Sequence, residues 1–472
     1  MRTFNLTALY LLMLGPIAGQ ETTINWDAPM GIDAAETGYS NLRMELDPDG
    51  NPIVLHGKSG SAGGLYCSRW NGAGFDDATA VTAETGIFIN DSEGPRMAVS
   101  GNKVVVAYQI SGEWDTGGRV VISEDGGQTW GDPIAVAPEA TEDHFMPVPA
   151  LDADGDPWVA LKWGNAPALE GVLDWNEEEG AFNAATDAGA VLPGDAVCEC
   201  CASMPFIIGD QRYNLVRNNN NNVRDFHLLR ANGDGVWTES LDVDPTNWLI
   251  NSCPASEAEV ALLGDGNIAA VFMSAAEGGS RTYWSTIDPA AWTLLGSDRI
   301  EPTLDFNENN PSVSADGDHA VAAWERSDGG YNVMVGVGAN TAAGMAQWTA
   351  NAASTTEALS GHSRKPVIRL KNGVVHLVYQ RASDALVHYL KGTIETAGTD
   401  RVQAAEWMCA PTESGWRIAG TQGTFQWRLY DLSGRSMASG NSTDQRIACP
   451  LEGAAILEVV ADGRQQAFKV FR

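Results

Sequence analysis

The sequence is poor in basic side chains. Its 472 residues include 29 Lys and Arg against 61 Asp and Glu, a formal net charge of −32 at pH 7. Such a charge repels phosphate backbones and argues against general nucleic-acid binding. Charged residues of both signs make up only 19%, which argues against a coiled coil or a disordered tail. After residue 20 no run of about 18 apolar residues occurs, so no transmembrane helix is expected.

Three common site motifs are also missing. No H-E-x-x-H segment is present, which removes the usual zinc protease signature. Gly57-Lys58-Ser59 matches the end of a phosphate-binding loop, but Pro52 stands where its first glycine should be. The Asp-x-Asp-Gly turns lack the distal Glu of an EF-hand loop, so hairpin turns explain them better.

The first twenty residues have the pattern of an export signal. Met1-Arg2-Thr3 is a short basic start, Leu6 to Ile17 is an apolar run, and Ala18-Gly19-Gln20 supplies small residues for cleavage. This predicts a secretory signal peptide over residues 1–20 and an exported, extracellular or cell-surface protein. Disulfides are then expected among the seven cysteines, and the odd number leaves at least one cysteine outside any pair within the chain.

A strand–turn–strand unit repeats along the chain at intervals of 51 to 57 residues. The turns are centred on Gly50, Gly101, Gly155, Gly209, Gly266, Gly317 and Gly373. Most are followed by an apolar, β-rich run such as Val104–Tyr108. Each unit therefore predicts two strands joined by a tight turn.

An aromatic marker repeats in phase with these turns, at Phe75, Trp130, Phe182, Trp237, Trp292 and Trp348. Each lies near the turn between a third and a fourth strand, and four strands at this period predict a β-propeller blade. The last unit shows only three strands, and Ile24–Pro29 resembles an isolated fourth strand. We therefore predict an all-β fold over residues 21–395, a seven-bladed β-propeller closed by the N-terminal strand, with six blades as the alternative.

One unit carries a family motif. Ser123, Asp125, Gly127, Thr129 and Trp130 fill every defined position of the Asp-box, S-x-D-x-G-x-T-W. The Asp carboxylate is expected to accept backbone N–H bonds within the turn, while the Trp packs between sheets. The chain therefore resembles the sialidase-like Asp-box (BNR) propellers. In that family the box is a structural turn on the face opposite the usual site, so it implies the fold and not the reaction.

The pattern changes after the repeats. Residues 396–404 are small and polar and predict a linker, and residues 405–472 predict a small β-sandwich. The segment from Tyr430 to Arg435 (Y-D-L-S-G-R), the L-x-G turn at Leu451 and Lys469-Val470 resemble the C-terminal sorting domain of the type IX secretion system of Bacteroidota. The resemblance implies that the type IX secretion machinery is a partner of this protein. Cys409 and Cys449 are a candidate disulfide in this part.

A cysteine cluster is the most unusual feature. Propeller sites collect on the face formed by the connections between blades and by the loops between second and third strands. Cys198, Cys200, Cys201 and Cys253 fall in two neighbouring inter-blade connections on that face. Two disulfides are one interpretation, and a free-thiol or redox role is another. A third is a soft metal site for copper or zinc, with His144 as a further ligand.

Residues 198–254 also resemble a group of secreted sialidase-like proteins of unknown activity, through C-x-C-C, Arg217, Arg224-Asp225 and Trp248-x4-Cys253-Pro254. The resemblance implies that this face is the functional one. A sialidase needs arginines around a substrate carboxylate together with an acidic partner. The candidate catalytic residues on this face are Arg217, Arg224, Asp225, Glu325 and Arg326, although the R-I-P motif that usually carries the first arginine is absent.

The sequence therefore predicts an exported sialidase-like propeller that binds or cleaves extracellular glycans, with glycoside hydrolysis of the sialidase type as the possible activity. The alternative is a copper- or zinc-binding propeller with its cysteine cluster on the functional face.

Overall fold

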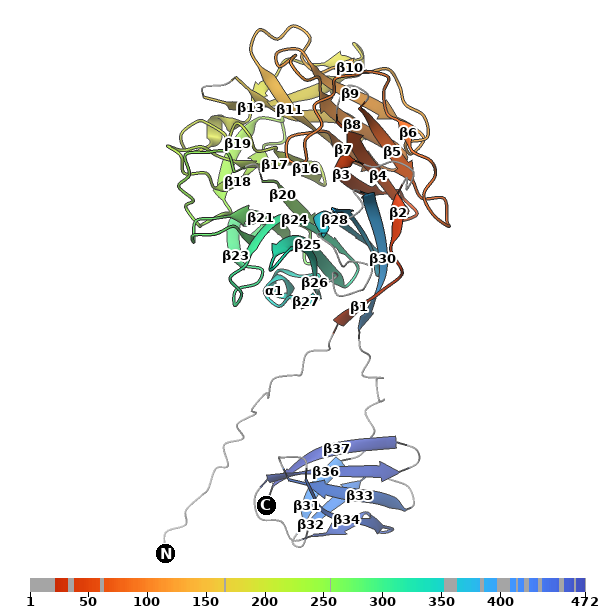
Figure 1. Cartoon of the computed structure of the whole chain (residues 1–472). Helices are drawn as coiled ribbons and strands as arrows, with labels where there is room; N and C mark the ends of the chain where they lie inside the picture. The colour runs from red at the N-terminus through yellow and green to blue at the C-terminus, as the bar shows by residue number, and fades with distance from the viewer. Residues whose placement is uncertain are drawn as a thin grey trace, which may run out of the picture. The chain divides into compact units, whose positions relative to one another are not determined.

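The computed structural model of the chain is all-β (Figure 1). It describes residues 22–32, 38–59, 63–164, 167–254, 256–351, 363–382, 386–396, 408–412, 415–419, 424–431, 435–449, 454–461 and 464–471. The predicted signal peptide and residues 397–404 of the predicted linker lie outside these ranges. Contacts divide the chain into a unit of Glu21–Thr396 and a second unit that contains Ala397–Arg472. Within the described ranges, no helix has the length and apolarity needed to span a bilayer.

The described part of the larger unit contains seven antiparallel sheets, each with four strands on its main path. In chain order, the first sheet holds β3 (Tyr39–Leu46), β4 (Pro52–Lys58), β5 (Gly64–Arg69) and β6 (Thr79–Ala80), and the second holds β7 (Arg96–Ser100), β8 (Lys103–Gln109), β9 (Gly118–Ser123) and β10 (Ile134–Ala135). The third holds β11 (His144–Leu151), β12 (Pro157–Trp163), β13 (Leu169–Asn176) and β14 (Ala181–Phe182), and β15 (Thr186–Asp187) also pairs with β13. The fourth holds β16 (Met204–Ile208), β17 (Gln211–Arg217), β18 (Phe226–Ala231) and β19 (Trp237–Asp242). The other three are β20 (Ala258–Leu262), β21 (Ile268–Ser274), β22 (Arg281–Asp288) and β23 (Thr293–Arg299); β24 (Asn307–Asp316), β25 (His319–Ser327), β26 (Tyr331–Ala339) and β27 (Thr349–Asn351); and β28 (Ser363–Lys371), β29 (Val374–Arg381), β30 (Leu386–Thr396) and β1 (Thr22–Trp26), with β2 (Met30–Ile32) also on β30. One α-helical turn, α1 (Ala342–Met345), and one 3₁₀ turn, η1 (Gly189–Val191), complete the described elements of this unit.

The first strands of the sheets lie side by side around a ring. Each of β3, β7, β11, β16, β20 and β24 contacts the first strand of the next sheet, and β28 contacts β3 (Figure 1). The order of the sheets therefore closes on itself, which is the arrangement of a β-propeller.

The N-terminal strand closes the last sheet. Strand β1 pairs antiparallel with β30, from Thr22 opposite Thr396 to Trp26 opposite Gly392. The prediction that an N-terminal segment supplies the fourth strand of the last unit is confirmed. A Cβ on Gly392 would lie 2.5 Å from Ile24 Cγ2 and 2.6 Å from the Trp26 ring, so only glycine permits this close pairing.

The core lies between neighbouring sheets. Second strands such as β8 and β21 are buried along almost their whole length because both of their faces are covered. Between the first two sheets, for example, Ile53 and Leu55 pack against Val104, Val106 and Tyr108. Equivalent clusters join each of the remaining pairs of neighbouring sheets around the ring. Each buried Val or Leu in them contributes roughly 1.5–3 kcal/mol.

The segment predicted to be an Asp-box is a tight turn after β9. Asp125 Oδ1 accepts hydrogen bonds from the backbone N–H groups of Gln128 at 2.9 Å and Thr129 at 2.8 Å, and its Oδ2 accepts from Thr129 Oγ1 at 2.6 Å. Ser123 Oγ donates to Asp125 Oδ1 and accepts from Gly127 N, both at 2.8 Å. The hydrogen bonds from Thr129 hold the pKa of Asp125 down, at about 2.

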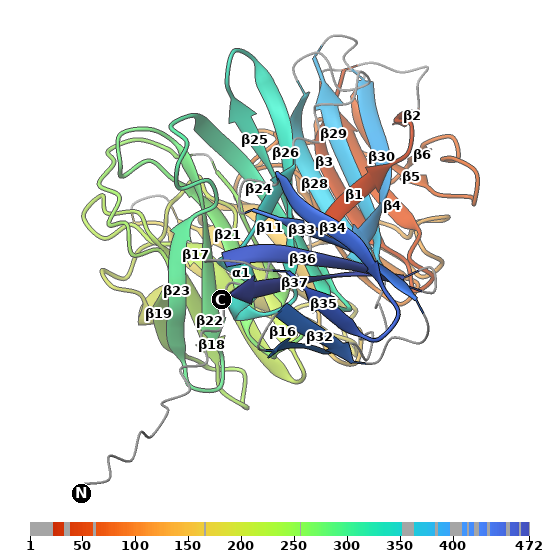
Figure 2. The ribbon, with the colours of Figure 1, turned by 90° about the horizontal axis from the view of Figure 1, so that it is seen from below.

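The second unit contains two antiparallel sheets among its described residues. One holds β31 (Met408–Thr412), β32 (Gly415–Ala419) and β35 (Arg446–Ala448). The other holds β34 (Ser436–Ser442), β33 (Phe425–Tyr430), β36 (Ala454–Ala461) and β37 (Arg464–Phe471), all labelled in Figure 2. Side chains of both sheets, including Trp416, Ile447, Phe425 and Leu457, share one buried cluster. Cys409 and Cys449 are not bonded to each other, so the expectation of a disulfide here is wrong.

We expect Asp125→Asn to lower the free energy of unfolding at pH 7 by about 1 kcal/mol, because the amide accepts fewer and weaker hydrogen bonds than the carboxylate. The folded-state pKa is depressed, so the stabilisation is present above the unfolded pKa of about 4 and disappears as the pH falls toward 2. Urea unfolding of both proteins at pH 7 and pH 2.5 measures the difference. Glu124→Gln, at an exposed position of the same turn, is the control, and an equal Asp125→Asn effect at both pH values would contradict the assignment.

Candidate functional site

The segment from Cys198 to Cys201 connects η1 to β16 and is anchored at both ends. At its start, Cys198 N donates to Arg217 O at 2.8 Å. Beyond its end, Ser203 Oγ joins a buried pair formed by Lys162 Nζ and Glu170 Oε2, which are 2.5 Å apart. Lys162 and Glu170, on β12 and β13, are both almost fully buried. The cysteine segment is therefore held at its start by β17 and beyond its end by the neighbouring sheet.

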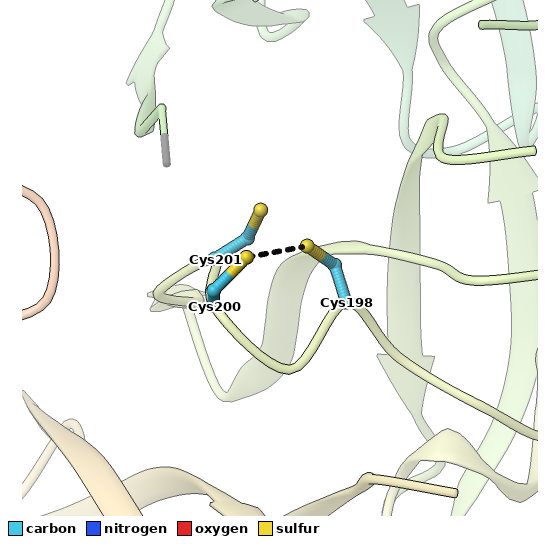
Figure 3. Close-up of side chains that lie close together, drawn as sticks. All are labelled: Cys198, Cys200 and Cys201. Carbon is cyan, nitrogen blue, oxygen red and sulfur yellow. Dashed lines mark hydrogen bonds between the residues drawn. The ribbon is translucent and has the colours of Figure 1, made fainter. Parts of the chain in front are cut away.

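Three sulfurs of this segment lie close together (Figure 3). The Sγ atoms of Cys198, Cys200 and Cys201 are all within 4.8 Å of one another. Cys200 forms a disulfide with Cys253, whose own position is exposed. Cys198 and Cys201 are free and buried, and the Cys198 and Cys200 sulfurs are 3.7 Å apart. One disulfide and two free thiols thus stand where the sequence left two disulfides, a metal site and a free-thiol role open.

Two arginines lie beside the Cys198 thiol. Arg224 Nη1 donates to Cys198 Sγ at 3.2 Å, and Arg224 also pairs through both Nη atoms with the Glu199 carboxylate at 3.1 Å. Burial by itself raises the pKa of Cys198, but the hydrogen bond from Cys201 and the charges of Arg217 and Arg224 outweigh burial and lower the pKa to about 6. Burial and the neighbouring Cys198 raise the pKa of Cys201.

The predicted metal ligands are not all together. His144 is outside the group of three sulfurs; its Nδ1 donates to Glu142 O at 2.7 Å and its ring stacks on Trp163. With Cys200 and Cys253 joined, two thiols remain, fewer than the four ligands of a structural zinc site. Copper or zinc binding at this cluster stays a prediction.

The predicted catalytic residue Arg217 is fully buried. Its Nη1 donates to Arg224 O at 2.8 Å and its Nη2 to Met273 O at 2.7 Å. Its guanidinium carbon lies 4.0 Å from the centre of the Phe226 ring and 5.3 Å from that of Trp248. Through these contacts Arg217 links β17 to the following loop and to β21.

Arg224 and Asp225 lie in the same loop, after the run of asparagines. Asn221 and Asn222 adopt left-handed backbone conformations (φ 52° and 69°), which Asn tolerates better than most residues. Asp225 is buried, and its Oδ1 accepts a hydrogen bond from Trp248 N at 2.8 Å. Burial raises the pKa of Asp225. This loop is therefore held against the connection that carries Cys253.

Glu325 and Arg326 lie on a different sheet, at the end of β25. Glu325 pairs with Arg364 at 3.1 Å, and Arg326 pairs with Glu301 at 3.0 Å and Asp328 at 2.6 Å. The structure brings Arg217, Arg224 and Asp225 together with the cysteines, whereas Glu325 and Arg326 have partners of their own. The catalytic assignment of these five residues stays a prediction.

A pocket of about 300 Å³ opens next to the cysteine segment, and the sequence analysis did not identify it. It is lined by Phe88, Glu93, Gln109, Trp114, Asp143, Phe145, Met146 and Glu199. These residues come from connections between sheets and from the ends and loops of β8 and β11. The available signal was Trp114, an aromatic residue between two acids in a loop joining second and third strands.

The pocket combines aromatic faces with hydrogen-bond acceptors. The Phe88 and Trp114 rings meet edge to face with centroids 5.4 Å apart. Gln109 is 3% exposed; its Nε2 donates to Glu113 O, but its buried Oε1 has no hydrogen-bond partner among the described residues. Burial raises the pKa of Glu93. The lining therefore offers aromatic faces and carboxylate oxygens to a ligand.

A second cavity, of about 440 Å³, lies among the first strands of the ring and includes Arg43, Arg96 and Arg369 in its lining. Arg43 and Arg96 both pair with Glu257, at 3.0 and 3.1 Å. Arg369 pairs with Glu45 at 2.5 Å and with Glu259 at 3.2 Å. Because glutamates already neutralise these arginines, an anionic ligand would have to displace them.

The chain matches no protein-family model and no curated protein. Among solved structures it is similar to the Hadza microbial sialidase Hz136 (12% identity, TM-score 0.44, 77% of this chain and 68% of that chain). It is also similar to the polysaccharide lyase Uly1 (10%, 0.46, 82% and 94%) and to a fungal alcohol oxidase of the AA5 family in complex with copper (10%, 0.48, 95% and 100%). These are distant similarities of fold, and they identify neither a substrate nor a site.

The stabilising contribution of two buried carboxyl groups should fall between pH 5 and pH 8. Burial raises the pKa values of Asp244 and Glu308 to about 7, so in this range these two groups bind more protons in the folded state than in the unfolded chain. Their contribution to the free energy of unfolding then decreases as pH rises, whereas the buried His56, His227 and His376, whose pKa values burial lowers, contribute in the opposite direction. Urea unfolding at pH 5 and pH 8 measures the net slope. Glu308→Gln should make this slope more positive and Glu178→Gln, at an exposed position, should not; a slope that Glu308→Gln leaves unchanged would refute the contribution of Glu308.

Proposed function

We propose that this chain is an exported, seven-bladed β-propeller that binds extracellular glycans in the pocket around Trp114. The observation that carries the proposal is a pocket that is walled by Phe88, Trp114 and Phe145 and that also has the acidic residues Glu93, Asp143 and Glu199 in its lining. A sugar ring presents a C–H face that packs on aromatic rings and hydroxyl groups that donate to acceptors. The carboxylates of Glu93 and Asp143 supply such acceptors.

The charge of the pocket favours a neutral sugar or an amino sugar. Three carboxylates, from Glu93, Asp143 and Glu199, line it. The neighbouring cation, Arg224, is already paired with Glu199. An acidic sugar would therefore enter a negative field in a chain of net charge −32. Sialidase-type hydrolysis through the five residues predicted from the sequence remains a separate hypothesis, and the proposal here is binding.

Localisation is part of the proposal. The pattern of residues 1–20 supports export through a signal peptide, and the resemblance of the segment around Tyr430–Arg435 supports the type IX secretion machinery as a partner. The two sheets of the second unit, which share one core, are compatible with the predicted β-sandwich. The seven sheets that close a ring support seven blades over the six-bladed alternative.

A glycan array with the mature protein should give signal on neutral or amino-sugar-containing glycans and none on sialylated ones. Trp114→Ala should weaken binding of the best array ligand about tenfold in calorimetry, roughly 1.4 kcal/mol, because it removes one stacking face. Gln109→Leu should weaken it similarly by removing the amide group.

Leu295→Ala, at an exposed position outside the pocket lining, is the control and should bind as the wild type does. An empty array, or array binding that survives Trp114→Ala, would count against the pocket. Release of shorter sugars from a bound glycan would show that the chain is a hydrolase and not only a binding protein.

A further inference from the structure

Three sulfurs near the pocket differ in exposure and bonding. Cys198 is a buried free thiol, Cys200 is half-buried and disulfide-bonded, and Cys253 is its exposed partner. The free sulfur lies 3.7 Å from the nearer disulfide sulfur, about van der Waals contact. We propose that Cys198, Cys200 and Cys253 form a thiol–disulfide exchange site that moves a reactive thiol from the interior to the surface.

The first step conserves atoms and electrons within the chain. The thiolate of Cys198 attacks Sγ of Cys200, a Cys198–Cys200 bond forms, the Cys200–Cys253 bond breaks, and Cys253 leaves as a thiolate. No external oxidant or reductant takes part. The released sulfur is at an exposed position, so the product displays a thiol that the starting form hides in a disulfide.

The second step uses an external disulfide, which is the class of partner the site would take. The exposed Cys253 thiolate attacks R–S–S–R, a Cys253–S–S–R bond forms, and one R–S⁻ leaves. The chain thereby becomes covalently joined to one half of the partner. The interior Cys198–Cys200 disulfide is retained through this step.

The surroundings favour the first step. Arg224 donates to the Cys198 sulfur and so stabilises its anionic form, while Glu199 holds the same guanidinium through two hydrogen bonds. The backbone hydrogen bond from Cys198 N to Arg217 O fixes the position from which the Cys198 sulfur attacks the disulfide. Glu199 also lines the Trp114 pocket, although the exchange does not depend on what that pocket binds.

Another buried cysteine lacks these features and provides a matched control. Cys67 is a free thiol that is 1% exposed on β5, beside the Asp-box turn. Burial raises its pKa, and it belongs to no group of neighbouring sulfurs in the described part of the chain. A reaction that depends on burial alone should treat Cys67 and Cys198 alike.

The test uses the full chain, purified without reductant and treated with 4,4′-dithiodipyridine, a neutral disulfide whose thiopyridone product absorbs light. Peptide mapping of the acid-quenched wild type should find the adduct on Cys253 together with a Cys198–Cys200 disulfide. Cys198→Ser should slow adduct formation on Cys253 at least tenfold, and Cys67→Ser should leave its rate unchanged.

The proposal is overturned if the wild type carries its adduct on Cys198, if Cys253 stays in its disulfide with Cys200, or if Cys198→Ser and wild type react equally fast. Circular dichroism verifies that the variant is folded. If Cys198→Ser does not fold, the two disulfide isomers in the quenched wild type decide the question. A stoichiometric copper or zinc ion with all four cysteines reduced, found by elemental analysis, would also overturn it and support the metal site instead.

Discussion

The structure depends on one constraint: every sheet of the ring buries both of its faces against neighbours. A single sheet could not cover its apolar second strand, and the two sheets at the ends of an open row would each leave one face in water. The contact between β28 and β3, reinforced by the pairing of β1 with β30, removes those exposed faces. Because the strands are thereby fixed, their connecting loops can carry polar and reactive groups without bearing the stability of the fold.

The cysteine face shows how such a scaffold positions side chains. Several charged residues near the cysteines have structural roles. Arg217 donates hydrogen bonds to two backbone carbonyl groups, and Lys162 forms a buried ion pair with Glu170 next to the Cys198–Cys201 segment. Removing one member of such a pair leaves an uncompensated buried charge, which costs about 3–5 kcal/mol. Arginines on a functional face are therefore not by themselves evidence for binding a substrate anion.

Much of the fold could be predicted because each repeat carries its own short signals, which recur at regular spacing along the chain. The Gly turns at Gly101 and Gly155, the aromatic marker at Trp130 and the isolated strand before Pro29 each follow from residue type and spacing. The site was harder to predict. Spacing placed four cysteines on one face, but spacing does not determine which sulfurs bond, and the aromatic pocket assembles single residues from Phe88 to Glu199 that share no motif.

The sequence by itself determined the all-β repeat, the N-terminal strand that completes the last sheet, and the face on which the cysteines gather, because these follow from periodicity and from turn chemistry. The tertiary structure alone decided that Cys200 bonds Cys253, that Arg224 lies against Cys198, and that Trp114 and Glu199 line one pocket. Each of these depends on distances between side chains from separate loops. Such distances are set by how the sheets pack around the ring, which no local pattern encodes.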